Sequence, residues 1–268
     1  MKILFIGDVV GRSGREALET HLPALKTKYT PDCLIVNGEN SAHGKGITER
    51  IANQFYELGV DCITTGNHVW GQKETLMFID QHDRLLRPMN FPKDTPGKGH
   101  VILNLASGRK IMIVNAMGRT YMEALDNPFH MLSGLVNDNK LKKTVDAIFV
   151  DFHAEATSEK IAIAHHLDGR VSAVIGTHTH MPTADTMILD GGTAYQSDAG
   201  MTGDYNSVIG VKKDVPIQRF LRGYMTDRMS PADGEGSVCG TFIETDDKTG
   251  LAISVQPVRV GGRLSSTE

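Results

Sequence analysis

The stretch Val171-Ser172-Ala173-Val174-Ile175-Gly176-Thr177-His178-Thr179-His180 joins a short apolar run to two imidazole side chains. The run is rich in β-branched residues, which predicts a buried strand over residues 171–175. In an extended chain His178 and His180 would project to the same side, as chelation of one ion requires. A His-x-His pair by itself is more often part of a polar loop, so its meaning depends on how the other apolar runs end.

Four further apolar runs end in the same way. Each leads into a side chain that binds metals: Lys2 to Gly7 into Asp8, Cys33 to Gly38 into Glu39-Asn40, Val60 to Gly66 into Asn67-His68, and Ala147 to Val150 through Asp151 into His153. Each motif alone is compatible with an ordinary turn, since Asp and Asn after Gly are common turn residues. Together, the five strand ends predict a metal centre assembled at one edge of a sheet.

The candidate ligands share one chemistry, because all of them are nitrogen or oxygen donors: Asp8, Glu39, Asn40, Asn67, His153, His178 and His180. Seven ligands are too many for one tetrahedral ion and fit two ions that share a bridge. The absence of a thiolate from this set favours Mn, Fe, Co or Zn over Cu(I) or an iron–sulfur cluster. Three of the motifs have a Gly immediately before the polar residue, which lets the backbone approach a crowded centre.

Helical patterns alternate with the strand-like runs in the first two thirds of the chain. We expect helices over Ser13 to Tyr29 (with Ser13 as N-cap and a kink or break at Pro23), Thr48 to Leu58, near Lys73 to Gln81, within Phe129 to Lys143, and Ser158 to Leu167. This alternation predicts parallel or mixed sheets with helices outside.

The last third changes character. The turn signals Asp190-Gly191-Gly192 and Asp246 to Gly250 lie between β-rich runs and predict antiparallel hairpins. One helix is expected near Asp214, with Pro216 in its first turn. The architecture that accommodates both parts is an α/β fold, an αββα sandwich of two mixed sheets.

The composition excludes several classes of protein. No linker or low-complexity segment divides the 268 residues, so we expect a single domain over 1–268. A net charge of −4 does not provide the excess of positive charge that is typical of proteins binding duplex nucleic acid or an anionic membrane. Cys33, Cys62 and Cys239 are widely spaced, as expected of buried reduced thiols in a cytoplasmic protein. No apolar run is long enough to span a membrane.

The assembled motifs resemble those of the calcineurin-like metallophosphoesterase superfamily. Gly66-Asn67-His68 matches one superfamily motif, His153 matches the lone histidine, and Gly176 to His180 matches the last motif with one inserted residue. Val10 stands where the superfamily has His, and Glu39 where Asp is usual. These departures, with the segments Asp151 to Lys160 and Asp198 to Gly203, resemble the bacterial YmdB-like phosphodiesterase family.

The resemblance implies a fold, an activity and a set of roles. It implies the αββα metallophosphoesterase fold, hydrolysis of phosphodiesters including 2′,3′-cyclic nucleotides, two iron or manganese ions, and a homo-oligomer, either a dimer or a tetramer. The implied roles are Asp8, Asn40 and His180 on one metal, Asn67, His153 and His178 on the other, Glu39 bridging both, and His68 beside them as acid or electrostatic stabiliser.

The mechanism expected from these roles is in-line attack by a hydroxide that the two ions activate, with His68 assisting the leaving alkoxide. Thr177 and Thr179 are candidates for orienting the histidines. Basic candidates for phosphate or base contacts are Arg12, Lys45, Arg119 and Arg170. Two alternatives stay open: a regulatory nucleotide- or partner-binding protein that uses the metals as a sensor, and a phosphomonoesterase.

Overall fold

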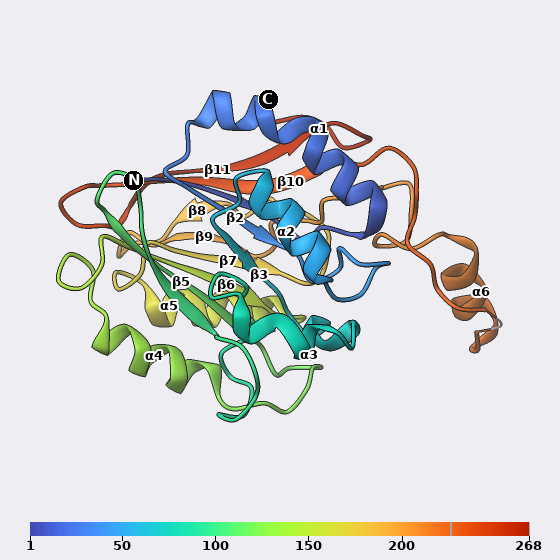
Figure 1. Ribbon diagram of the computed structural model, residues 1–268, viewed down its shortest axis with the longest axis horizontal. Helices are drawn as coiled ribbons and strands as arrows, with labels where there is room; N and C mark the ends of the chain where they lie inside the picture. The colour runs from blue at the N-terminus through green and yellow to red at the C-terminus, as the bar shows by residue number, and fades with distance from the viewer. Residues whose placement is uncertain (226, 268) are drawn as a thin grey trace.

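The computed structural model describes residues 1–225 and 227–267. Within these residues the strands form two sheets (Figure 1). The first sheet contains β1 (Lys2–Ile6), β2 (Cys33–Asn37), β3 (Cys62–Thr64), β10 (Val238–Thr245) and β11 (Ala252–Val260). Its order is β11-β10-β1-β2-β3, with β1 to β3 parallel and the β10–β11 hairpin antiparallel. The sheet is therefore mixed, and the predicted C-terminal hairpin is confirmed.

The second sheet has the order β4-β5-β6-β7-β9-β8. Its strands are β4 (His100–Asn104), β5 (Lys110–Met117), β6 (Ala147–His153), β7 (Ala173–Thr177), β8 (Met187–Ile188) and β9 (Ala194–Gln196). The four central strands run parallel, and β4 and β8 close the edges antiparallel. This sheet is also mixed, as the sequence predicted.

All helices but α6 (Asp214–Arg222) form two outer layers, and α6 stands apart from them (Figure 1). The other helices of the described residues are α1 (Gly11–Tyr29), α2 (Glu49–Glu57), α3 (Thr75–Phe78), α4 (Pro128–Asp138) and α5 (Thr157–Leu167), with 3-10 turns η1 (Val69–Gly71) and η2 (Ile79–Gln81). Side chains of α1 and α2 pack on the first sheet, and those of α4 and α5 on the second. The layer order is αββα, as predicted.

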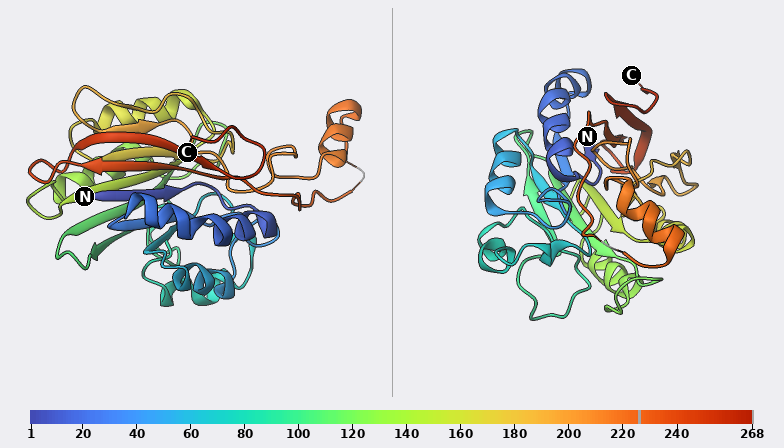
Figure 2. Two further views of the ribbon diagram at one scale, coloured as in Figure 1. Left: turned by 90° about the horizontal axis from the view of Figure 1, so that it is seen from above. Right: turned by 90° about the vertical axis from the view of Figure 1, so that its right-hand side faces the viewer.

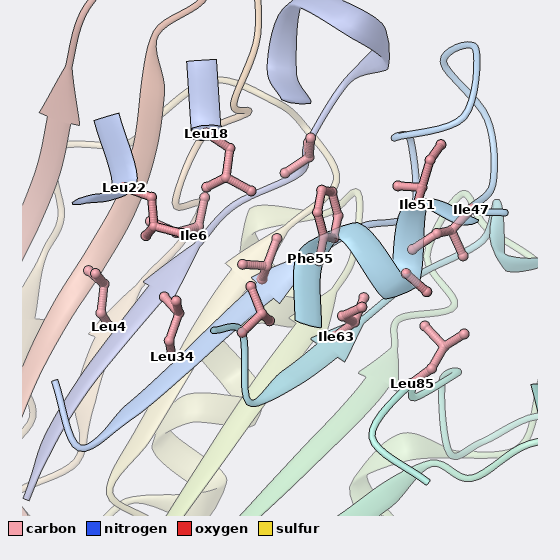
Figure 3. Close-up of a cluster of buried hydrophobic side chains, with 14 of the residues drawn as sticks. Leu4, Ile6, Leu18, Leu22, Leu34, Ile47, Ile51, Phe55, Ile63 and Leu85 are labelled. Atoms are coloured by element: carbon pink, nitrogen blue, oxygen red, sulfur yellow. The ribbon is translucent and has the colours of Figure 1, made fainter. Parts of the chain in front are cut away.

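Three buried clusters hold these layers together. Alternation along β1 sends Leu4 outward to the layer of α1 and α2, as Figure 3 shows, and Phe5 inward between the sheets. The Phe5 ring meets Phe149 of β6 with 5.0 Å between centroids, so aromatic packing joins the two sheets. On the far side, Val150 of β6 packs with Ile163 of α5.

The start and the course of α1 differ from prediction. The helix begins at Gly11 after Val10, and Ser13 is not its N-cap, because its buried hydroxyl donates to the carbonyl of Gly234. The helix is not broken at Pro23. Pro23 lies on the exposed face, where the carbonyl that loses its helical partner is free to face water, while Leu22 on the other face is buried.

Other differences concern the second sheet. Strand β6 runs on past Val150 to His153, because β5 and β7 pair with it along both sides. The edge strand β4 was not anticipated. The three cysteines are buried and unpaired, as expected. None of the helices in the described part of the chain has the length and apolar character needed to cross a bilayer.

Phe55 tests the packing of α2 against the first sheet. Its side chain is 1% exposed, and Phe55→Ala should lower the free energy of unfolding by about 3–5 kcal/mol because a cavity remains. Urea denaturation measures this loss. Met77→Ala, at a side chain 80% exposed on α3, is the control and should stay within about 0.5 kcal/mol of wild type. A loss below about 1 kcal/mol for Phe55→Ala would contradict this packing.

Candidate metal centre

The predicted ligands lie where strands of both sheets end. Asp8, Glu39, Asn40 and Asn67 follow β1, β2 and β3 of the first sheet, whereas His153 ends β6 and His178 and His180 follow β7 of the second. The prediction of one edge of one sheet is therefore wrong, because apolar patterning does not say which strands pair. The structure stacks the two sheets so that these ends meet.

Two overlapping clusters of ligand atoms form between the sheets. Glu39, His153 and His178 make one, Asp8, Glu39 and His180 make the other, and within each the ligand atoms lie within 4.8 Å of one another. Asp8, Glu39 and His153 are fully buried. Glu39 belongs to both clusters, which is the position of a bridging carboxylate.

Each cluster also contains a side-chain amide. Asn67 Oδ1 lies 2.9 Å from His153 Nε2, and His178 Nδ1 lies 3.0 Å from the same atom. On the other side, Asn40 Nδ2 lies 3.0 Å from Glu39 Oε1 and 3.1 Å from His180 Nε2. The structure therefore brings all seven predicted ligands together, in the two groups that the resemblance implies.

Unsatisfied atoms at this centre fit a pair of cations. Asp8 Oδ1 and Asn40 Oδ1 are buried and have no hydrogen-bond partner among the residues that the structure describes. Such atoms are costly inside a protein unless something binds them. Gly66 leaves the necessary room, because a Cβ there would lie 2.3 Å from the His153 ring and 2.4 Å from Glu39 Oε2. The nitrogen and oxygen donor set thus fits two transition metal ions.

The electrostatics favour positive charge at the centre. Burial raises the pKa of Asp8 to about 7, a cost that a neighbouring cation would remove. Burial opposes protonation of His153, but the charges of Glu39 and Asp8 outweigh it and raise the pKa of His153 to about 9. Burial and the nearby His153 lower the pKa of His178 to about 3, so this imidazole keeps a free lone pair at neutral pH.

The second nitrogen of each histidine is held by a neighbour. Thr177 Oγ1 donates to Asp151 Oδ1 (2.7 Å), so its lone pair is available to His153 Nδ1 (2.9 Å). His178 Nε2 lies 3.1 Å from Glu155 Oε2, and His180 Nδ1 lies 2.8 Å from the carbonyl oxygen of Ile209. These contacts fix which nitrogen faces the centre, as the partners of metal-binding histidines do. Thr177 therefore orients His153.

The loop that carries His178 and His180 is strained and anchored. Both residues have positive φ, 100° and 68°, which non-glycine residues rarely adopt. Between them, the backbone N–H and hydroxyl of Thr179 donate to Asp198 Oδ2 at 3.0 and 2.7 Å. The same oxygen accepts from Lys160 Nζ at 2.9 Å in a buried ion pair. Asp198 thus holds the strained loop in place.

His68 lies beside Asn67, next to the two clusters. Its backbone N–H donates to Glu39 Oε2 at 3.2 Å. Burial lowers the pKa of His68, with Glu39 opposing that effect and Lys45 adding to it. Among the basic candidates, Lys45 is thus the one whose charge acts on His68. Arg170 does not serve it, because its guanidinium donates to Ser133 and Asn137 on α4.

Four residues that hold the candidate ligands or the threonines beside them were not assigned roles from the sequence: Asp151, Glu155, Lys160 and Asp198. Asp151 and Glu155 are two residues before and after His153, a spacing that offered a usable signal. Asp198 and Lys160 are 38 residues apart, and only the fold shows that they meet.

Comparisons with known proteins agree with this geometry. A family model described as "YmdB-like protein" matches residues 4–258. The chain is 46% identical to the "2′,3′-cyclic-nucleotide 2′-phosphodiesterase" of Bacillus subtilis, over 97% of both chains. It is 37% identical to a "putative phosphatase/phosphodiesterase" of Mycoplasma genitalium, over 97% of this chain and 93% of that protein.

Solved structures share the fold over nearly the whole chain. A hypothetical protein from Thermus thermophilus superposes with a TM-score of 0.90 at 41% identity, covering 98% of this chain and 100% of that one. A structure titled a novel phosphatase, from Mycoplasma pneumoniae, superposes with a TM-score of 0.90 at 36% identity, covering 97% and 93%. With the family model and these relatives spanning almost its full length, the chain belongs to the YmdB-like family and has the calcineurin-like αββα fold.

Proposed function

We propose that this chain is a dinuclear-metal phosphodiesterase and that 2′,3′-cyclic nucleotides are among its substrates. One observation carries the proposal: the buried Glu39 is shared by two clusters of potential ligand atoms. A shared carboxylate would hold two ions about 3.5–4 Å apart, the spacing that two-metal hydrolysis of phosphate esters uses. The name of the Bacillus subtilis relative supports the substrate class.

The chain's residues divide into binding and orienting groups. In the proposal Asp8, Asn40 and His180 hold one ion, Asn67, His153 and His178 hold the other, and Glu39 holds both. When bound, two such ions polarise the phosphate and lower the pKa of a water molecule. The family resemblance implies iron or manganese, and the nitrogen and oxygen donor set is equally compatible with zinc or cobalt.

We assign His68 to the leaving group. Adjacent side chains after a strand diverge, so Asn67 is free to face the metals while His68 faces the substrate. Burial favours the neutral ring, and the negative charge of a phosphodiester beside it favours the protonated form. A protonated His68 would donate to the leaving alkoxide or stabilise its charge.

A direct assay tests this function. Metal-reconstituted protein is given 2′,3′-cyclic nucleotides, 3′,5′-cyclic nucleotides, a generic diester and a generic monoester. We expect hydrolysis of diesters, with the 2′,3′-cyclic compounds preferred. Turnover of the monoester alone would make the chain a phosphomonoesterase, and binding without turnover would make it a regulatory protein. Either result would overturn the proposal.

We also propose that the chain works in the cytoplasm as a homo-oligomer, a dimer or a tetramer. Three buried, unpaired thiols are the pattern of a reducing compartment. We expect a small phosphodiester as substrate, as the family resemblance implies. The net charge of −4 favours neither duplex nucleic acid nor an anionic membrane as a partner.

Glu39→Gln tests the bridge. The change removes one negative charge shared by both clusters, so both ions should be lost together after reconstitution with Mn or Fe. Elemental analysis of the desalted protein measures the stoichiometry. Glu57→Gln, at an exposed position on α2, is the matched control and should keep up to two ions per chain. Retention of two ions by Glu39→Gln would show that Glu39 does not bind them.

His68→Ala tests the leaving-group role. It should lower kcat by about 10²-fold or more while the metal content stays near that of wild type. The loss should shrink for a nitrophenyl diester, whose leaving group hardly needs a proton. The exposed His165→Ala on α5 is the control. Loss of metal would make His68 a ligand, and equal losses for good and poor leaving groups would remove the general-acid role.

Thr179→Val tests the anchoring of the histidine loop. The variant loses the hydroxyl donation to Asp198 but leaves the Asp198–Lys160 pair intact. We expect metal dissociation constants to rise about 10-fold or more, because neighbours that orient ligands matter on that scale. Calorimetric titration with Mn²⁺ measures them, with the exposed Thr27→Val as control. Unchanged affinity would show that the loop needs no such anchor.

A further inference from the structure

A basic arm extends from the body of the molecule (Figure 2). We call residues 212–225 and 227–230 the arm; it carries α6. At its base the backbone N–H of Lys212 donates to the carbonyl of Ser230 at 2.9 Å, and that of Ala232 to Gly210 at 2.8 Å. Figure 2 shows α6 standing away from both sheets, and within this helix Pro216 is the buried residue.

The helix of the arm exposes an apolar stripe. Ile217, Phe220 and Leu221 are spaced as neighbours on one helical face, and Phe220 and Leu221 are 83% and 72% exposed. Tyr224 and Met225, also exposed, follow after Arg222 and Gly223. A nine-residue helix is too short to be stable alone in water, so a surface that covers the stripe would stabilise it.

The charge of the arm indicates which surface covers its apolar stripe. The arm has five Lys and Arg residues against two Asp, whereas the rest of the chain has 23 basic against 30 acidic residues. Arms repel one another and are attracted to an acidic body. The body of a second copy of this chain has the complementary charge.

The position of the arm's base indicates which part of the second copy's body the arm would contact. Ile209, three residues before the arm, accepts from His180 Nδ1 through its carbonyl, so the arm leaves from the edge of the metal centre. On that edge lies what we call the rim surface, formed by Tyr121, Glu155 and Met181, all exposed. Glu155 contacts His178, and its backbone N–H contacts Met122 Sδ beside Tyr121.

The rim surface combines the properties that the arm requires. Tyr121 is 91% exposed and has a positive φ of 62°, and Met181 follows His180 directly. Glu155 adds negative charge. Because arm and rim surface share one edge of the molecule, a twofold axis beside that edge would let two copies exchange arms.

We propose that the apolar stripe of α6 docks on the rim surface of a second copy, so that each metal centre is bordered by the other copy's arm. This deepens the homo-oligomer proposed above and names its contact. The experiments below measure the mass of the oligomer and the proximity of two residues, and neither depends on hydrolysis. The proposed contact can therefore be disproved while the phosphodiesterase proposal stands, and the phosphodiesterase proposal can be disproved while the contact stands.

The first experiment measures mass by sedimentation equilibrium. Wild type should be at least a dimer of the 29.2 kDa chain, and Phe220→Asp should raise the dimer dissociation constant at least about 30-fold, the size expected for a central interface residue. Thermal unfolding of the dissociated monomer checks that it stays folded. Met77→Asp, another exposed apolar position outside the arm, is the control and should keep the wild-type mass. A monomeric wild type, or an unchanged constant for Phe220→Asp, would overturn the proposal.

The second experiment identifies the surface that the arm contacts. Tyr121→Cys and Phe220→Cys proteins are mixed and oxidised, so a disulfide between the two new thiols can only join different copies. A covalent dimer in the mixture, absent from either variant alone, supports the proposal. No such dimer, or wild-type binding to anionic vesicles in place of self-association, would overturn it.

Discussion

The arrangement of the whole molecule depends on two fully buried carboxylates, Asp8 and Glu39, that face the imidazoles of the opposite sheet. Buried negative charges are strongly unfavourable unless positive charge or hydrogen bonds compensate them. Asp8 Oδ1 has no hydrogen-bond partner within the described residues, so a cation bound at that atom would compensate its charge. The five strand ends serve to bring those carboxylates and histidines into one small volume.

Close approach of backbone segments makes this possible. A Cβ on Gly7, after β1 of the first sheet, would lie 2.0 Å from the carbonyl oxygen of Gly200, after β9 of the second. A Cβ on Gly176 in β7 would lie 1.8 Å from the carbonyl oxygen of Ser197, which follows the neighbouring strand β9 of the same sheet. Only glycine fits where these backbones pass, directly before Asp8 and before the loop of His178. The strain of that loop is offset by the buried Asp198–Lys160 pair behind it. The centre is thus held by backbone packing and a buried ion pair, which suits a site that must keep its geometry during turnover.

The strand ends that carry the candidate ligands could be predicted, because each apolar run stops at a polar residue and the pattern of apolar residues in the sequence shows where each run stops. Periodicity does not report which strands pair, so His153 and His178 were expected on the same sheet edge as Asp8 and lie on the other sheet. The break predicted at Pro23 was wrong, because the sequence alone does not show which face of α1 is exposed. Asp198 could not be linked to Thr179 before the fold brought β7 and the segment after β9 together.

The central claim is that one glutamate bridges two metal ions between the sheets, and anomalous X-ray scattering from crystals reconstituted with manganese tests it most directly. The account predicts two anomalous peaks about 3.5–4 Å apart, with the Glu39 carboxylate in contact with both. It also predicts that His178 and Asn67 contact the ion at one peak, and that His180 and Asp8 contact the ion at the other. A single peak, or two peaks that Glu39 does not join, would contradict it.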